Sequence, residues 1–232
     1  MEAARLKRVA AGTHPELLYP EYRSTPGRSP RQPPVRLEQG ATELSVLAAP
    51  VELIAPADAD LTRQSTGVPL GERIVVTGRV LDEDGRPVRK SLVEIWQCNA
   101  AGRYSHRNDQ HDAPLDPHFV GRGKTLTDDE GRYRFVTIKP GAYPWGNHAN
   151  AWRPAHIHFS LFGNAYAQRL ITQMYFPGDP LLAFDPIYHS VPERARTRLV
   201  SRFELESTVA DIALGYRFDI VLRGRDATPL GL

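Results

Sequence analysis

Short runs of β-branched and aromatic residues recur between residues 73 and 222, and turn-forming residues separate them. Such runs are typical of β-strands, and no pattern of long helices lies between them. The expected strands cover residues 73–81, 91–98, 133–138, 156–162, 170–176 and 216–222. The sequence therefore predicts an all-β fold, an antiparallel β-sandwich with few short helices, rather than alternating β and α units.

Two further details of the fold can be predicted from local signals. The acidic segment 82–85 ends in glycine and lies between the first two expected strands, so these strands are predicted to form a hairpin-like unit. Among the later segments, residues 193–205 alone have a pattern that suits a helix.

The first 70 residues differ in composition from the rest of the chain. Residues 15–36 are rich in proline and arginine, which disfavours a regular helix or a central strand. Leu17, Leu18, Tyr19 and Tyr22 are apolar anchors, which favour an extended arm docked on the body or on a partner over a disordered arm. A short helix is expected within residues 41–61. We therefore divide the chain into an N-terminal arm and packing segment, residues 1–70, and a β-sandwich domain, residues 71–232.

Composition excludes several classes of function. The formal net charge is +2 and the basic residues are scattered, so nucleic-acid binding has little support, whereas small anionic substrates fit. A single cysteine, Cys98, excludes an intrachain disulfide and suits a reducing compartment. The chain shows no apolar stretch of the length of a signal peptide or a membrane span, so we expect a cytoplasmic protein without membrane contact.

A pair of histidines in one expected strand is the strongest chemical signal. Side chains alternate along a strand, so His156 and His158 share one face while Ile157 and Phe159 point to the other. Two tyrosines in turns marked by glycine or proline, Tyr104 and Tyr143, are the other candidates for the site. The pattern alone leaves two interpretations open, because such histidines and tyrosines more often serve in packing than in metal binding.

If these four side chains meet, the tyrosines decide which metal they suit. A phenol has a pKa of about 10, so it ionises at neutral pH only beside a strong positive charge. Two phenolates and one hydroxide would neutralise a trivalent ion, and two imidazoles would complete five ligands, which favours Fe(III). Zinc prefers histidine, cysteine or carboxylate, and Fe(II) oxygenases use two histidines with one carboxylate. His106 lies two residues beyond Tyr104 and is a further candidate.

Several segments of the chain resemble one family, the intradiol ring-cleaving dioxygenases. The similarity extends from about residue 14 to residue 225, and its most specific segments are residues 93–104, 113–117, 140–145 and 152–159. The proline-rich arm, residues 14–32, is similar to that of the iron-binding β subunits of members that act on protocatechuate, whereas catechol-cleaving members carry a long helical N-terminal region. The resemblance implies a β-sandwich enzyme of aromatic-compound catabolism.

The resemblance also implies roles for individual residues. The implied ligands of a non-haem Fe(III) are Tyr104, Tyr143, His156 and His158, with a hydroxide in the fifth position. This ligand set leaves His106 as a neighbour of the site. The implied catalytic residues are Arg153, which stabilises charge on the reacting substrate, and Tyr143, which takes up a substrate proton. The residues implied to line the substrate pocket are Tyr22, Trp145, Gln173 and Ile187, with Arg28 a less supported addition.

The implied reaction is cleavage of protocatechuate by O2 to 3-carboxy-cis,cis-muconate, with an α subunit as the protein partner. Two alternatives stay open at this stage. The substrate could instead be catechol, a chlorocatechol or hydroxyquinol. Residues 76–80 and 84–88 also resemble non-enzymatic, transthyretin-like β-sandwich binding modules, although such modules would not need the four candidate ligands together.

Overall fold

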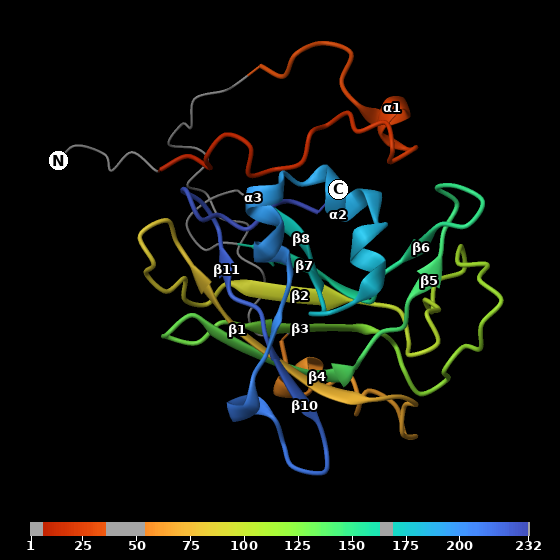
Figure 1. Ribbon diagram of the computed structural model, residues 1–232. Helices are drawn as coiled ribbons and strands as arrows, with labels where there is room; N and C mark the ends of the chain where they lie inside the picture. The colour runs from red at the N-terminus through yellow and green to blue at the C-terminus, as the bar shows by residue number, and fades with distance from the viewer. Residues whose placement is uncertain (1–6, 36–53, 163–168, 232) are drawn as a thin grey trace.

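In the computed structural model, which describes residues 7–35, 54–162 and 169–231, two β-sheets pack face to face (Figure 1). The first sheet comprises β1 (Arg73–Leu81), β4 (Arg132–Ile138), β9 (Arg202–Phe203), β10 (Leu214–Arg217) and β11 (Ile220–Val221). The second sheet comprises β2 (Leu92–Trp96), β3 (Arg122–Leu126), β7 (His156–Phe162) and β8 (Arg169–Tyr175). A separate pair is formed by β5 (Tyr143–Pro144) and β6 (Trp152–Arg153).

The helices within the described residues are all short. The α-helices are α1 (Thr25–Arg28), α2 (Pro186–Ser190) and α3 (Glu193–Arg196). Single 3-10 turns lie at η3 (Pro56–Ala59), η4 (Pro180–Ala183), η5 (Thr197–Leu199) and η6 (Leu205–Ser207). The expected β-sandwich with few short helices is confirmed. Its second sheet is wholly antiparallel, in the order β3-β2-β7-β8, while the first is mixed because β1 pairs in parallel with β10 and β11.

The predicted hairpin of the first two strands is wrong. The turn itself forms, since Asp82 accepts hydrogen bonds from the backbone N–H groups of Asp84 and Arg86, and Gly85 has a φ of 76°. Beyond this turn the chain crosses to the other sheet, where β2 pairs with β3 and β7. β1 instead pairs with β4. The turn was predicted correctly, but the two strands belong to opposite sheets of the sandwich.

Other boundaries also differ from expectation. The helix predicted over residues 193–205 ends at Arg196, and η5 follows it. The chain then becomes extended at Val200, and the backbone N–H of Ser201 donates to the carbonyl of Tyr175. Pairing with β8 thus overrides the helical pattern. The last expected strand divides into β10 and β11, and between them Asp219 accepts a hydrogen bond from the backbone N–H of Arg79.

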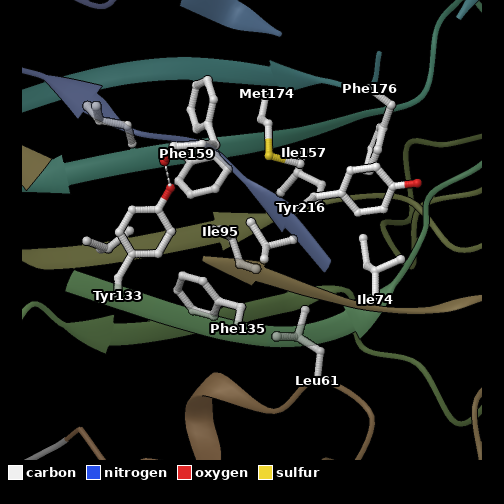
Figure 2. Packing of buried hydrophobic residues seen from close by; sticks show 14 of the residues in the cluster. Leu61, Ile74, Ile95, Tyr133, Phe135, Ile157, Phe159, Met174, Phe176 and Tyr216 are labelled. Carbon is white, nitrogen blue, oxygen red and sulfur yellow. Dashed lines mark hydrogen bonds between the residues drawn. The ribbon is translucent and has the colours of Figure 1, made fainter. Parts of the chain in front are cut away.

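The core lies between the two sheets (Figure 2). Ile74 and Phe135 from the first sheet meet Ile157 and Phe159 of β7, and all four are fully buried. The Phe159 ring lies 5.3 Å from that of Phe218, centroid to centroid, which is a favourable separation for aromatic packing. Because Ile157 and Phe159 point inward, the alternate residues of β7 are forced to the outer face of the second sheet.

Residues 7–35 run over the side of the sandwich that carries α2 and α3 (Figure 1). Asn147, which is buried, donates to the Glu21 carbonyl at 2.8 Å, and its side-chain oxygen accepts from the Arg23 N–H at 2.9 Å. Near the start of the arm, Arg194 of α3 donates to the Gly12 carbonyl, and His14 accepts from the Leu230 N–H. The prediction that the arm docks on the body is therefore confirmed for these residues.

The helix expected within residues 41–61 lies largely outside the described residues, although η3 lies near the end of this range. The boundary at residue 70 stays a prediction. No helix in the described part of the chain is long and apolar enough to cross a membrane.

Replacing Asn147 with alanine is expected to release the arm. The substitution removes two of the three hydrogen bonds that join Asn147 to Glu21 and Arg23, those made by the Asn147 side chain, and keeps the one accepted by its backbone carbonyl. Trypsin should then cleave after Arg23, Arg28 or Arg31 about tenfold faster, because each buried hydrogen bond contributes about 1 kcal/mol and cleavage follows the population of the open form. The control is Asn150→Ala, at an exposed position of the same loop. Equal cleavage rates for the two variants would contradict this role for Asn147.

Candidate metal centre and active site

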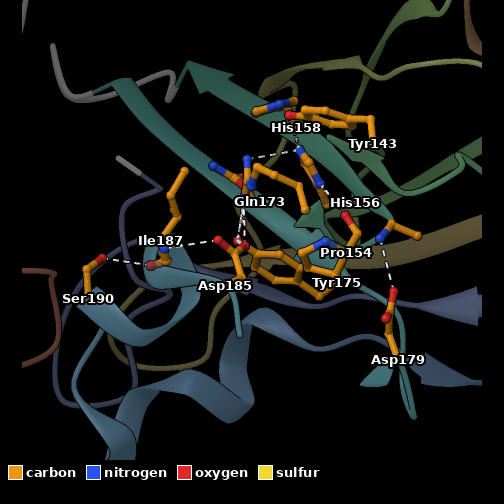
Figure 3. A network of polar contacts seen from close by, with 12 residues as sticks. Tyr143, Pro154, His156, His158, Gln173, Tyr175, Asp179, Asp185, Ile187 and Ser190 are labelled. Atoms are coloured by element: carbon orange, nitrogen blue, oxygen red, sulfur yellow. Dashed lines mark hydrogen bonds and ion pairs between the residues drawn. The ribbon is translucent and has the colours of Figure 1, made fainter. Parts of the chain in front are cut away.

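β7 presents two histidines on the outer face of the second sheet, as the alternation predicted. The Nδ1 atom of His156 lies 2.7 Å from the Pro154 carbonyl oxygen (Figure 3). A proton on Nδ1 can donate this hydrogen bond, which leaves the lone pair of Nε2 free for a metal. The His158 ring stacks on Trp96 of the neighbouring strand, with centroids 4.7 Å apart and planes inclined by only 2°. Both imidazole rings are therefore held in fixed orientations.

A loop brings Tyr104 to these imidazoles, and the short strand β5 brings Tyr143. The hydroxyl oxygen of Tyr104 lies 3.3 Å from Nε2 of His158, and that of Tyr143 lies 3.5 Å from Nε2 of His156. Gly102 allows this approach, because it has a φ of 80° and an added Cβ would collide with the Ala142 carbonyl oxygen. The structure thus brings together all four predicted ligands, which come from three separate segments.

The site favours the neutral forms of all four side chains. Burial raises the pKa of Tyr104 and of Tyr143 above the usual range for a phenol. Burial, together with the neighbouring Arg153 cation, lowers the pKa of His158 to about 3 and that of His156 well below its usual value. The imidazoles are therefore ready to bind a metal, whereas the phenols would ionise only against a strong positive charge.

The donor set suits a hard, trivalent ion. Among the described residues, no group of three or more His, Cys, Asp and Glu side chains could hold a metal, so a site with two histidines and a carboxylate is not formed there. Cys98 is buried and donates its S–H to the Gly141 carbonyl, and burial raises its pKa to about 12, so it supplies no thiolate. Two imidazoles and two phenols fit the non-haem Fe(III) that the sequence predicts.

Arg153 is fully buried beside this cluster and is held at one end of its guanidinium. NH2 donates to Oε1 of Gln173 at 2.7 Å and to Oδ2 of Asp185 at 2.8 Å, and it lies 3.0 Å from the Tyr175 hydroxyl. NH1 instead lies 3.3 Å from Nε2 of His156. Burial opposes the charge on Arg153, but the neighbouring Tyr175 and Asp185 raise its pKa, so the residue is a fixed cation at the site.

Two other predicted site residues, Gln173 and Trp145, contact Arg153, and the rest lie beyond them. The Trp145 ring lies 5.6 Å from the guanidinium carbon, and the Tyr22 ring of the arm lies 5.4 Å from that of Trp145. Gln173 is on β8, and Ile187 is a buried residue of α2, two residues after Asp185. Arg28 is exposed and lies over the Tyr22 ring at 5.0 Å.

Not every candidate joins the cluster, and two residues were missed. His106 is exposed, and its Nδ1 accepts a hydrogen bond from the Asn108 N–H; that it neighbours the site stays a prediction. Tyr175 and Asp185 were not predicted. Tyr175 follows Gln173 by two residues on β8 and so shares its face, and Asp185 precedes Pro186 at a helix start; both are signals that the sequence contained.

Comparisons with known proteins identify the family of the chain. A family model described as "Dioxygenase" matches residues 49–224, and one described as "Protocatechuate 3,4-dioxygenase beta subunit N terminal" matches residues 8–40. The first model covers most of the β-sandwich, so the chain belongs to the intradiol dioxygenase family.

Individual relatives refine the comparison. The protocatechuate 3,4-dioxygenase beta chain of Burkholderia cepacia is 62% identical over 220 residues, which are 94% of either chain. The protocatechuate 3,4-dioxygenase alpha chain of Pseudomonas putida is 33% identical over 68% of this chain and 75% of that one. The solved 3-chlorocatechol 1,2-dioxygenase of Rhodococcus opacus 1CP superposes with a TM-score of 0.56 and 25% identity, over 72% of this chain and 65% of that one. Within its family, the chain is thus similar along nearly its whole length to a protocatechuate 3,4-dioxygenase beta chain.

Proposed function

We propose that the protein cleaves the ring of protocatechuate between its two hydroxyl-bearing carbons, incorporating both atoms of O2 to give 3-carboxy-cis,cis-muconate. The observation that carries this proposal is the convergence of two phenols and two imidazoles beside a buried arginine. Similarity to a protocatechuate-cleaving beta chain over 94% of the chain supports this substrate over catechol, hydroxyquinol and a binding-module role.

Non-haem Fe(III) is the proposed cofactor, and Tyr104, Tyr143, His156 and His158 are its proposed ligands. When bound, the ion supplies the Lewis-acid chemistry that makes a catechol reactive toward oxygen. The two phenolates would balance part of its charge while the imidazoles stay neutral. The hydrogen bond from His156 to the Pro154 carbonyl supports this role, because it directs the Nε2 lone pair toward the tyrosines.

The chain's own residues are proposed to handle protons and charge. The Tyr143 phenolate oxygen would accept a proton from a substrate hydroxyl, and its burial favours the neutral phenol that results. The NH1 edge of Arg153 would stabilise negative charge that develops on the substrate, in surroundings where water screens little of it. The ring would lie against Trp145 and Ile187, with Tyr22 and Gln173 orienting its polar groups.

An α subunit is the proposed protein partner. The arm carries Leu17 and Leu18, which are each 50% exposed although the arm is docked, and such residues suit a second protein surface. Similarity to named beta and alpha chains of one enzyme supports a heteromer. We also place the enzyme in the cytoplasm, because its single thiol, Cys98, suits a reducing compartment.

Oxygen uptake tests the proposed reaction directly. The iron-loaded chain, alone and combined with a homologous α subunit, should consume one O2 per protocatechuate and prefer this substrate to catechol and hydroxyquinol. Preference for catechol would move the chain to a different substrate class. The absence of uptake with all three catechols, by a complex that contains iron, would overturn the proposed function.

The Tyr104→Phe variant tests the metal ligands. An Fe(III) phenolate absorbs visible light, so the purified protein is expected to be reddish brown, with about one iron per chain. Loss of the Tyr104 oxygen should shift the visible band and weaken iron retention. Tyr216→Phe, at a buried position in the core, is the matched control and should keep the spectrum. An unchanged spectrum in Tyr104→Phe would exclude Tyr104 as a ligand and return attention to His106.

The Arg153→Ser variant separates charge stabilisation from metal binding. Iron content and colour should persist, because a guanidinium donates hydrogen bonds and is no metal ligand. Turnover should fall about a hundredfold to a thousandfold, the usual cost of losing one preorganised donor. Arg202→Ser, at an exposed position on β9, is the control. Anaerobic substrate binding, followed by the colour change, is compared with turnover in the same variant. A proportional fall in both would limit Arg153 to substrate binding.

A further inference from the structure

One buried carboxylate, Asp185, joins three parts of the site. Its side chain is fully buried and precedes α2, where Oδ1 accepts a hydrogen bond from the Ile187 N–H at 3.0 Å. Its other oxygen, Oδ2, accepts from Arg153 NH2 at 2.8 Å and lies 3.2 Å from the Tyr175 hydroxyl (Figure 3). Asp185 therefore connects the start of α2 with β8 and with the arginine.

The contacts of Arg153 show which end of the guanidinium is fixed. NH2 has three acceptors within hydrogen-bond distance, which are more than its two hydrogens can satisfy. NH1 faces His156 at 3.3 Å, and Nε has no hydrogen-bond partner among the described residues. Fixing the NH2 end leaves the opposite edge directed at the cluster of tyrosines and histidines.

Charge distinguishes Asp185 from the other two acceptors. Gln173 and Tyr175 are neutral, and the ion pair with Asp185 is the single salt bridge of Arg153 within the described part of the chain. A cation as buried as Arg153 is stable only beside an opposite charge with good geometry. The ion pair therefore sets both the charge balance and the direction of the guanidinium.

We propose that Asp185 is a positioning residue for ring cleavage, which holds the Arg153 guanidinium toward the reacting ring and ties it to the α2 wall that carries Ile187. This inference rests on the proposed function and deepens it. Asp185 itself does not touch the substrate, so its effect on turnover must pass through Arg153. That dependence can be measured.

Asp185→Asn is the primary variant. Asparagine keeps the shape of the side chain and is a good residue for a helix start, so α2 is retained while the negative charge is lost. With the iron-loaded complex, turnover on protocatechuate should fall about tenfold to a hundredfold, since a displacement of about 1 Å in a catalytic group can cost this much. Anaerobic substrate affinity should change less than about threefold, because the lost stabilisation acts on the transition state and not on the bound substrate.

A double-mutant cycle with Arg153→Ser is the decisive comparison. Adding Asp185→Asn to Arg153→Ser should lower turnover no further, because the carboxylate then has no guanidinium to hold. If the two losses multiply, Asp185 acts independently of Arg153 and the proposal is wrong. Even if Asp185→Asn alone does not fold, a further fall in turnover from Arg153→Ser to the double variant refutes the proposal.

Thermal unfolding of the iron-free protein gives a second readout. Arg153→Ser leaves Asp185 buried without its cation, so adding Asp185→Asn should raise the unfolding temperature again. Glu83→Gln, which breaks the buried ion pair of Glu83 with Arg223, is the matched control: it should lower the unfolding temperature and leave turnover unchanged. An Asp185→Asn variant that behaves like this control would show that the carboxylate only stabilises the fold.

These outcomes are separable from failure of the proposed function. A wild-type complex that binds iron but cleaves no catechol refutes the function and the positioning role together. An active wild type in which the Asp185 and Arg153 effects multiply refutes the positioning role alone.

Discussion

The register of β7 between β2 and β8 is the constraint on which the rest of the site depends. Trp96 of β2 lies opposite His158, and Gln173 of β8 lies opposite His158 on the other side. His156 lies opposite Tyr175 in the same ladder. A shift of one residue would turn these side chains into the sandwich and expose Ile157 and Phe159. The hydrophobic core therefore sets the register, and the register assembles the outer face on which the chemistry takes place.

The tyrosines reach this face from outside the second sheet, Tyr104 on a loop and Tyr143 on the short strand β5. The close approach of these two segments depends on a glycine with a positive φ, Gly102. Burial makes the phenols difficult to ionise, so the site as folded holds neutral oxygens beside neutral nitrogens. Such a donor set favours a trivalent over a divalent ion, because the higher charge offsets more of the free-energy cost of ionising two buried phenols.

Sequence reasoning found several strands and the four converging side chains for physical reasons. The run at 73–81 coincides with β1 because it is rich in β-branched residues, and that at 156–162 coincides with β7, where apolar residues alternate with polar ones. The same reasoning failed where long-range pairing decides the structure. The hairpin at residues 82–85 was wrong because β2 belongs to the other layer, and the helix from residue 193 is shortened by pairing near Tyr175. Asp185 was missed because no periodicity links a helix start to Arg153, 32 residues earlier in the chain.

The buried network around the four proposed ligands is neutral overall, so the ligands themselves decide which charge of metal ion the site prefers. Arg153 and Asp185 carry opposite charges in one buried pair, and Tyr175, Gln173 and the two histidines are neutral. These groups together therefore add no net charge. Any positive charge brought into the site must be balanced by the phenols and by an anionic substrate, so a catechol that gives up both protons completes the balance. The same pairing holds the Arg153 guanidinium in one orientation, so its proposed stabilisation of charge on the ring requires no reorientation during the reaction.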